Sequence, residues 1–325
     1  MTLDLEIPWV EKYRPQSFND IVSQNIAINS LKNFVKSGNM PHMIFTGPAG
    51  TGKTSTALIV AKKVLKKENY YRDLLELNAS DTVRMDYVRN VLKDFVNQNM
   101  IIRENNLKIV ILDEADNIPN QVQQALRRII EQASSRVKFF LMCNYINRII
   151  DPIISRCAVF RFVNLPKENI VARLKFIAEK EDLSIPDDKA DAFFDRLYFI
   201  SGGDLRKAIN TLQMSVSLEL LDKLDINEIL KISGFIDHKT LEILIGAFQS
   251  KDYKKARNVL ESIETFDSRN FIRQIIGILP KLKLTPKKIN NLISYIGEID
   301  YRISLGSDEQ IQIFALIAEI IKNVE

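Results

Sequence analysis

Gly47-Pro48-Ala49-Gly50-Thr51-Gly52-Lys53-Thr54 is a glycine-rich run that identifies the fold class of the chain. It has the form G-x-x-x-x-G-K-[ST], and it stands between a short apolar run and a helical pattern. The glycines let backbone N–H groups surround phosphates, and the helix that follows presents its positive end to them. Lys53 can reach the terminal phosphates, and the Thr54 hydroxyl can ligate Mg²⁺. The stretch therefore predicts a phosphate-binding loop between a strand and a helix.

Short β-rich runs alternate with helical patterns over the first half of the chain, which is typical of a parallel sheet with helices on both faces. The predicted strands are Met43–Thr46, Leu74–Asn78, Lys108–Asp113, Val137–Asn144 and Ala158–Phe162. Between them, Gln121–Gln132 has apolar residues at the i, i+3, i+4, i+7 and i+8 positions of one helix face. From about Leu165 the patterns are helical to the end of the chain. We expect an α/β domain at residues 1–163, a small helical domain at 164–225 and an all-α domain at 226–325.

The composition is that of an ordinary globular protein, with 325 residues, 46% hydrophobic and 26% charged. The longest apolar runs, such as Phe139–Cys143, are far shorter than the roughly 20 residues that a membrane span needs. The acidic start, Met1 to Glu6, lacks the basic-then-apolar layout of a secretory signal. We therefore expect an intracellular protein with no membrane partner. The stretch Arg127–Arg161 holds seven basic residues against two acidic ones, and it could face nucleic-acid phosphate.

Carboxylates follow the third predicted strand, in the sequence Asp113-Glu114-Ala115-Asp116. In a protein with a phosphate-binding loop, a hydrophobic strand that ends in aspartate brings a carboxylate to the Mg²⁺ shell, which is the role we assign to Asp113. The adjacent Glu114 is suited to polarise a water for attack on the γ-phosphate. Asn144 ends the fourth strand, and its amide could contact the γ-phosphate or the attacking water. The set predicts nucleotide hydrolysis.

Together these segments resemble the AAA+ ATPases, and specifically the clamp-loader small subunits of archaea and eukaryotes, the replication factor C family. The resemblance covers nearly the whole chain. Its segments are Pro8-Trp9-Val10-Glu11-Lys12-Tyr13-Arg14-Pro15, Asp20-Ile21-Val22, Asn39-Met40-Pro41-His42, Leu75-Glu76-Leu77-Asn78-Ala79-Ser80-Asp81, Gln124-Ala125-Leu126-Arg127-Arg128 and Ser155-Arg156-Cys157. The last triplet is the most diagnostic of them.

The resemblance implies a P-loop AAA+ domain with a five-stranded parallel sheet, a helical lid and an all-α collar, with ATP and Mg²⁺ as cofactors. The implied ATP-binding residues are Val10, Tyr13, Arg14, Ile21, Val22, Gly47, Pro48, Ala49, Gly50, Thr51, Gly52, Lys53, Thr54, Ser55, Asn144 and Arg206. The metal residues are Thr54 and Asp113. The catalytic residues are Lys53, Glu114, Asn144, Arg156 and Arg206.

In the family, two of these catalytic residues act on a site outside their own domain or subunit. By resemblance, Arg156 is a finger that enters the ATP site of a neighbouring subunit, so that hydrolysis depends on assembly. Arg206, in Gly203-Asp204-Leu205-Arg206, resembles the lid-domain sensor that reaches the γ-phosphate. A surface ion pair is the alternative for the first arginine, and a solvated helix face is the alternative for the second.

DNA contacts are implied for Arg84, Arg89, Lys93 and Arg128, mainly to phosphates and without regard to sequence. The chain departs from the family here. After Ser80-Asp81 the family usually continues with an acidic residue, arginine, glycine, isoleucine and aspartate, whereas this chain has Thr82-Val83-Arg84-Met85-Asp86. The arginine has moved by one position and the glycine is gone, which puts the DNA contact of that loop in question.

We therefore expect a subunit of a pentameric clamp loader, which uses ATP to load a ring-shaped sliding clamp onto primer–template DNA. Its partners would be the other loader subunits, the clamp and the DNA. The alternatives are another AAA+ enzyme, such as a helicase loader or a branch-migration motor, and a loader subunit with an inactive ATP site. The sequence leaves open whether the ring holds several copies of this chain or four different small subunits, and so whether the protein works in a cytoplasm or a nucleus.

Overall fold

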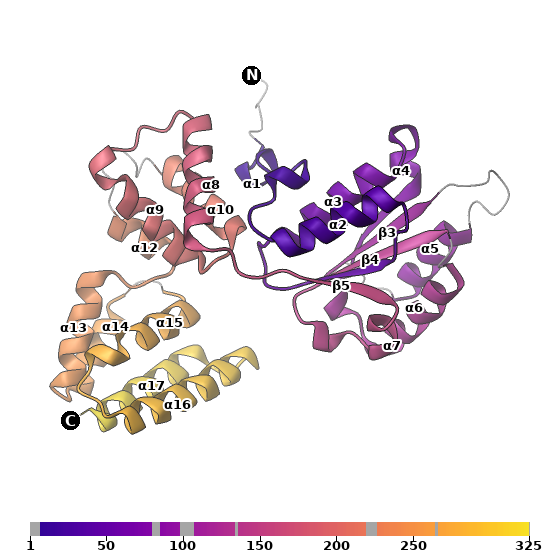
Figure 1. The fold of residues 1–325 in the computed structure, drawn as a ribbon. Helices are drawn as coiled ribbons and strands as arrows, with labels where there is room; N and C mark the ends of the chain where they lie inside the picture. The colour runs from indigo at the N-terminus through magenta and orange to yellow at the C-terminus, as the bar shows by residue number, and fades with distance from the viewer. Residues whose placement is uncertain are drawn as a thin grey trace, which may run out of the picture. The chain divides into compact units, whose positions relative to one another are not determined.

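The computed structural model describes residues 7–79, 85–97, 107–133, 136–218, 226–263 and 266–324. Two compact units make up the chain, unit 1 with residues 1–183 and 197–213 and unit 2 with residues 184–196 and 214–325. Figure 1 labels the helices and strands along the chain. The expected division into three domains, at 163/164 and 225/226, stays a prediction.

Unit 1 is built on a parallel sheet, and its five strands within the described residues have the order β2-β3-β4-β1-β5. The strands are β1 His42–Thr46, β2 Leu74–Asn78, β3 Lys108–Asp113, β4 Val137–Cys143 and β5 Cys157–Arg161. The predicted parallel sheet is confirmed, with shifts of one residue at the start of β1, the end of β4 and both ends of β5. Thr46 lies opposite Cys143. Leu112 lies opposite Leu141, and Asp113 is the next residue after Leu112. The strand ends that carry the candidate site therefore meet at one edge of the sheet.

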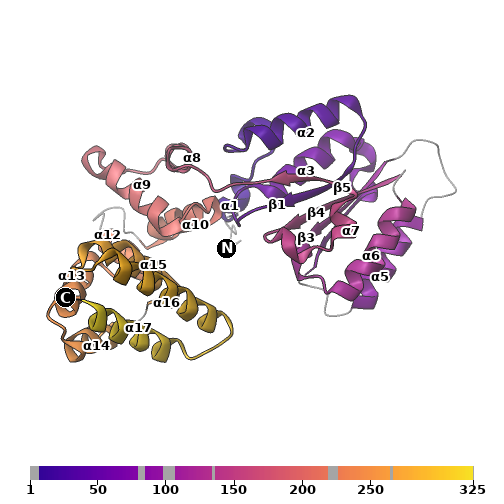
Figure 2. The same ribbon diagram turned by 60° about the horizontal axis from the view of Figure 1, so that its bottom comes forward.

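Helices cover both faces of this sheet (Figure 2). Because successive strand residues point to opposite faces, Met43 and Phe45 pack on one side with Leu31, while Ile44 packs on the other side with Leu126. The helical elements up to the end of the sheet are α1 Trp9–Lys12, η1 Phe18–Asp20, α2 Asn25–Ser37, α3 Lys53–Val64, η2 Lys67–Asn69, α4 Tyr70–Asp73, α5 Met85–Asn97, η3 Ala115–Asn117, α6 Asn120–Ala133, η4 Ile146–Arg148 and α7 Asp151–Ile154. Unit 1 also contains α8 Lys167–Lys180 and most of α10 Leu205–Ser217.

A histidine begins β1. His42 is buried, its Nδ1 accepts a hydrogen bond from the backbone N–H of Phe139 at 3.1 Å, and its Nε2 has no hydrogen-bond partner among the described residues. Burial, with a smaller contribution from the charge of Lys138, lowers the pKa of His42 to about 4. The ring is therefore neutral at pH 7.

Unit 2 is helical throughout its described residues. Helix α9 spans Asp187–Ser201, and its residues up to 196 belong to unit 2. The later elements of the unit are α12 Ile226–Ile232, α13 His238–Gln249, α14 Tyr253–Glu261, α15 Ser268–Ile278, η5 Leu279–Lys281, α16 Pro286–Ser304 and α17 Glu309–Asn323. Phe248, Phe271, Leu292 and Leu316 lie in its core. A side-chain oxygen just before each of α13, α14, α15, α16 and α17 accepts a hydrogen bond from the backbone N–H three residues later. These caps fix where each helix begins.

The described helices include none that combines the length and the apolar character of a membrane span.

Candidate functional site

The loop of residues 47–52 joins β1 to α3, and Lys53 is the first residue of that helix. Lys53 is buried, and its Nζ donates hydrogen bonds to Gly47 O at 2.7 Å, Pro48 O at 2.8 Å and Asn144 Oδ1 at 3.0 Å. Burial lowers the pKa of Lys53, while the carboxylate of Asp113 acts in the opposite direction. A buried ammonium group thus lies inside the loop, where phosphate oxygens would be stronger acceptors than the carbonyls and the amide.

Gly50 brings the loop against the start of α10. Its φ is +67°, and a Cβ at this position would lie 1.7 Å from Asp204 Oδ1. The same carboxylate oxygen accepts a hydrogen bond from Lys207 N at 3.1 Å, within the first turn of α10. Only glycine fits both the backbone conformation and the contact. The packing fixes the position of the next residue, Leu205, and of Arg206 beside the loop.

Two oxygens at the sheet edge form a pair that fits a magnesium ion. Thr54 Oγ1 donates to Asp113 Oδ2 at 2.8 Å, and Asp113 Oδ1 accepts from Glu114 N at 2.9 Å. A hydroxyl and a carboxylate are hard oxygen ligands, which Mg²⁺ prefers, and it normally keeps several waters and phosphate oxygens as its other ligands. These two residues therefore suit the metal that the sequence predicts.

Glu114 follows the strand in a left-handed conformation, with φ of +53°. Its Oε2 accepts a hydrogen bond from Asn117 Nδ2 at 3.2 Å, and the residue lines the same pocket as Lys53 and Thr54. A carboxylate on the pocket wall, next to the metal pair, is in a position to accept a proton from a water.

Asp116 supports the candidate site at the end of β4, and the sequence reasoning assigned it no role. Its buried carboxylate accepts hydrogen bonds from the backbone N–H groups of Asn144 and Tyr145, both at 3.1 Å. These bonds hold the end of β4, so that the Asn144 side chain reaches Lys53. The sequence does contain a signal for this residue, because Asp116 ends the acidic sequence Asp113-Glu114-Ala115-Asp116.

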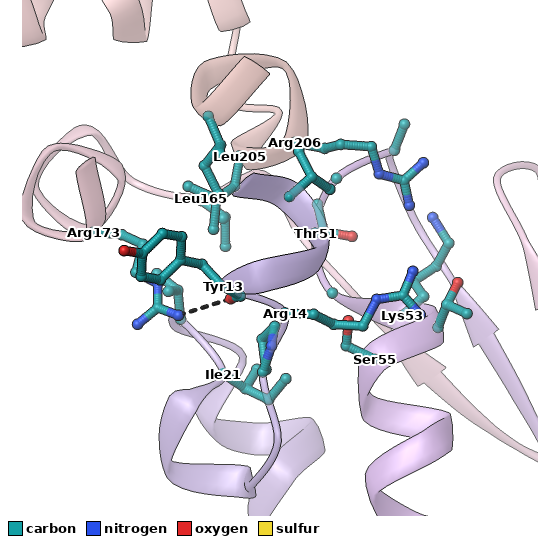
Figure 3. Close-up of a pocket in the computed structure, with 18 of the residues that line it drawn as sticks. Tyr13, Arg14, Ile21, Thr51, Lys53, Ser55, Leu165, Arg173, Leu205 and Arg206 are labelled. Atoms are coloured by element: carbon teal, nitrogen blue, oxygen red, sulfur yellow. Dashed lines mark hydrogen bonds between the residues drawn. The ribbon is translucent and has the colours of Figure 1, made fainter. Parts of the chain in front are cut away.

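The N-terminal segment and helix α8 supply the opposite wall. Arg173 of α8 donates through Nη2 to the carbonyl oxygen of Tyr13 at 2.9 Å, which is the dashed line in Figure 3. The hydroxyl of Tyr13 donates to Glu181 Oε1 at 2.6 Å. Burial and this hydrogen bond to the carboxylate raise the pKa of Tyr13 to about 12. In the same view Arg14 and Arg206 extend toward the side of the pocket that holds Lys53.

One pocket therefore contains nearly all residues of the predicted nucleotide site. The predicted residues that line it are Val10, Tyr13, Arg14, Ile21, Val22, Ala49, Gly50, Thr51, Gly52, Lys53, Thr54, Ser55, Asp113, Glu114, Asn144 and Arg206. Gly47 and Pro48 stand behind them as acceptors for Lys53. Further residues outside the predicted set also line the pocket, namely Pro15, Asp20, Cys143, Leu165, Arg173, Leu205 and Ile209. No quoted motif contains Leu165, Arg173 or Ile209, because they reach the pocket only through the packing of the helical part on the loop, whereas Leu205 stands next to Arg206 in the quoted sensor motif.

Arg156 lies outside this pocket. Its guanidinium donates through Nη1 to Pro152 O at 2.7 Å and forms an ion pair through Nη2 with Glu131 Oε1 at 2.6 Å. A residue that acts on a neighbouring subunit must be accessible, and this side chain is 36% exposed. Its action in trans stays a prediction.

The residues predicted to contact DNA are only partly described. Lys93 on α5 and Arg128 on α6 have exposed side chains. Arg84 lies outside the described residues, as does the side chain of Arg89.

Comparison with known proteins gives the family. The profile described as "ATPase family associated with various cellular activities (AAA)" matches residues 43–165, and the "Replication factor C C-terminal domain" matches residues 236–319. The replication factor C small subunits of Sulfurisphaera tokodaii and Aeropyrum pernix are each 41% identical to the chain, over 98% of it and 97% of the relative. The chain belongs to the replication factor C small-subunit family.

Membership in this family, together with the AAA profile, makes the replication factor C subunit an ATPase. Among solved structures, the Thermotoga maritima RuvB Holliday junction branch migration motor matches 84% of this chain and 93% of its own, with a TM-score of 0.57 and 16% identity. At that identity the likeness shows the shared fold alone. It gives no support to the alternative of a branch-migration motor.

Proposed function

We propose that this replication factor C subunit hydrolyses Mg·ATP at subunit interfaces of a pentameric clamp loader, and so drives loading of a sliding clamp onto primer–template DNA. The observation that carries the proposal is the division of catalytic groups. Lys53, Glu114 and Asn144 line the chain's own pocket, whereas Arg156 is exposed outside it. The arginines that line the described pocket are Arg14, Arg173 and Arg206, so the finger predicted at Arg156 would complete the site of a neighbour.

Each residue of the pocket would have a separate role in hydrolysis. Lys53 offers a buried positive charge to the terminal phosphates, and Asn144, held by Asp116, stands at the same end of the pocket. Thr54 and Asp113 would hold Mg²⁺, which when bound neutralises charge on the phosphates. Glu114 would orient a water and accept its proton. Arg206 extends from α10, so its contact with nucleotide would link the lid to the state of the site.

Assembly makes this site a switch. ATP held between subunits would order a spiral of AAA+ domains that binds the open clamp and the primer–template junction, and hydrolysis would release both. Arg84, Arg89, Lys93 and Arg128 would contribute phosphate contacts, so DNA affinity should fall steeply with salt and vary little with sequence. We place the protein inside the cell, in the cytoplasm or the nucleus according to its source.

Steady-state ATP hydrolysis by the subunit, purified together with the subunits that accompany it, tests the proposal. Primed DNA and the clamp together should stimulate hydrolysis, and Arg156→Ala should abolish the stimulated rate while nucleotide binding survives. A rate that neither DNA nor clamp raises, and that Arg156→Ala leaves unchanged, would contradict the proposed function and leave the fold and the family membership.

A further inference from the structure

Glu131, which lies in the last turn of α6, faces the predicted finger. Its Oε1 forms an ion pair with Nη2 of Arg156 at 2.6 Å, and the same oxygen accepts a hydrogen bond from Nε of Arg127 at 2.9 Å. The two arginines come from different elements, since Arg127 precedes Glu131 by one helical turn and Arg156 follows α7. One carboxylate oxygen therefore serves both.

A second contact holds the same guanidinium. Nη1 of Arg156 donates to the carbonyl oxygen of Pro152, in the first turn of α7, at 2.7 Å. The segment before α7 is itself fixed to α6, because buried Gln123 accepts a hydrogen bond from Ile150 N and donates one to Arg148 O, both at 2.9 Å. The distance between the finger and Glu131 is thus set by the fold.

The guanidinium remains able to act when it is held in this way. An arginine side chain carries five N–H donors in a planar fork, and the contacts to Glu131, to Pro152 and, from Nη1 at 3.5 Å, to the Ser155 hydroxyl use three of them. Two donors are left for oxygens of a phosphate group. A guanidinium that is already held in place loses less conformational entropy when it binds a phosphate than a side chain that samples many rotamers. The rate of a reaction depends on such positioning of the catalytic group.

We propose that Glu131 is a positioning residue for Arg156, which orients the finger toward the ATP site of the neighbouring subunit. The inference rests on the proposed function, in which Arg156 acts in trans. Both side chains are about one third exposed, so the ion pair contributes little to the stability of the fold. Loss of Glu131 should therefore change turnover and leave unfolding unchanged.

The test uses the assembled complex, with primed DNA and clamp present. Glu131→Gln keeps the size of the side chain and removes its charge; it should lower kcat for ATP roughly 10-fold and leave KM for ATP unchanged. Arg127→Gln is the matched control, because it removes the other partner of the same carboxylate and spares the finger. It should stay within about two-fold of the wild type. In an Arg156→Ala background, Glu131→Gln should not lower the residual rate further.

Each contrary result has a distinct meaning. If Arg156→Ala suppresses the stimulated rate and Glu131→Gln does not, the proposed function stands and the positioning role is wrong. An equal loss in Arg127→Gln and Glu131→Gln, or a further loss in the Arg156→Ala background, would mean that the carboxylate supports α6 generally, which also overturns the role. A higher rate in Glu131→Gln would overturn it as well. If Arg156→Ala leaves the rate unchanged, the proposed function fails.

Discussion

Replacing Gly50 by alanine should destabilise unit 1 more than the same replacement at Gly38. The two glycines have nearly the same φ, +67° and +69°. A Cβ at Gly38 would meet nothing within 4 Å, whereas a Cβ at Gly50 would lie 1.7 Å from Oδ1 and 2.4 Å from Cγ of Asp204. The comparison therefore separates the steric contact from the cost of the left-handed backbone.

The shared part of the cost is the left-handed conformation, about 1–2 kcal/mol for a residue with a Cβ. At Gly50 the Asp204 side chain must also rotate away, which breaks its hydrogen bond to Lys207 N at the start of α10. Loss of such a cap costs about 0.5–2 kcal/mol. Gly50→Ala should therefore cost about 1 kcal/mol more than Gly38→Ala, and further loss is expected because the Asp204 backbone lies only 3.1 Å from the new atom.

Urea unfolding followed by the fluorescence of Trp9 measures this difference, because Trp9 is the only tryptophan in the chain and is buried in unit 1. Combining Gly50→Ala with Asp204→Ala should cost less than the sum of the single changes, since both lose the same cap. Equal losses at Gly38 and Gly50, or strict additivity in the double variant, would refute the reasoning.

Three further substitutions test other parts of unit 1. Below pH 6.5 His42 becomes protonated in the unfolded chain, whereas in the folded chain its pKa of about 4 keeps it neutral. The free energy of unfolding should therefore be highest above pH 6.5 and fall as the pH drops toward 4. Between pH 7 and pH 5 the wild type should lose roughly 2 kcal/mol more than His42→Gln in the same Trp9 assay; parallel losses would contradict this. Glu114→Gln should retain ATP binding and reduce turnover by roughly 10²–10⁴-fold, and near-normal turnover would exclude it as the base. Asp116→Ala leaves two backbone N–H groups without an acceptor and should lower the unfolding free energy by about 2 kcal/mol, whereas Asp94→Ala, at an exposed site on α5, should not; equal effects would refute the anchoring role.

The sequence was sufficient for the sheet and for the centre of the site because both are encoded locally. Each strand is a short apolar run, and in a parallel sheet the residues after such runs meet at one edge. That rule brings Thr54, Asp113 and Asn144 together from three separate segments. Strand ends differ from the prediction by one residue, since hydrogen bonding and not apolar character decides them.

Residues that depend on packing between distant segments could not be found in this way. Arg173 reaches the pocket through the carbonyl of Tyr13, 160 residues earlier in the chain. Glu131 and Arg156 belong to separate elements, and nothing in their spacing predicts that they meet. The two compact units divide before α9, within α9 and within α10, whereas the sequence reasoning set one boundary at 163/164, where strand patterns give way to helical ones, and the other at 225/226, between helical segments.

The pocket wall has a consequence for protein engineering. Its lining begins at Val10 and ends at Ile209, whereas the AAA profile spans only residues 43–165. A fragment cut at the profile's borders would keep the phosphate loop but lose the Tyr13 and Arg173 wall, together with Arg206. Transplanting this pocket into another protein would therefore require about two hundred residues of contiguous chain, and a fusion at the N-terminus would need a spacer to leave Trp9 and its neighbours in place.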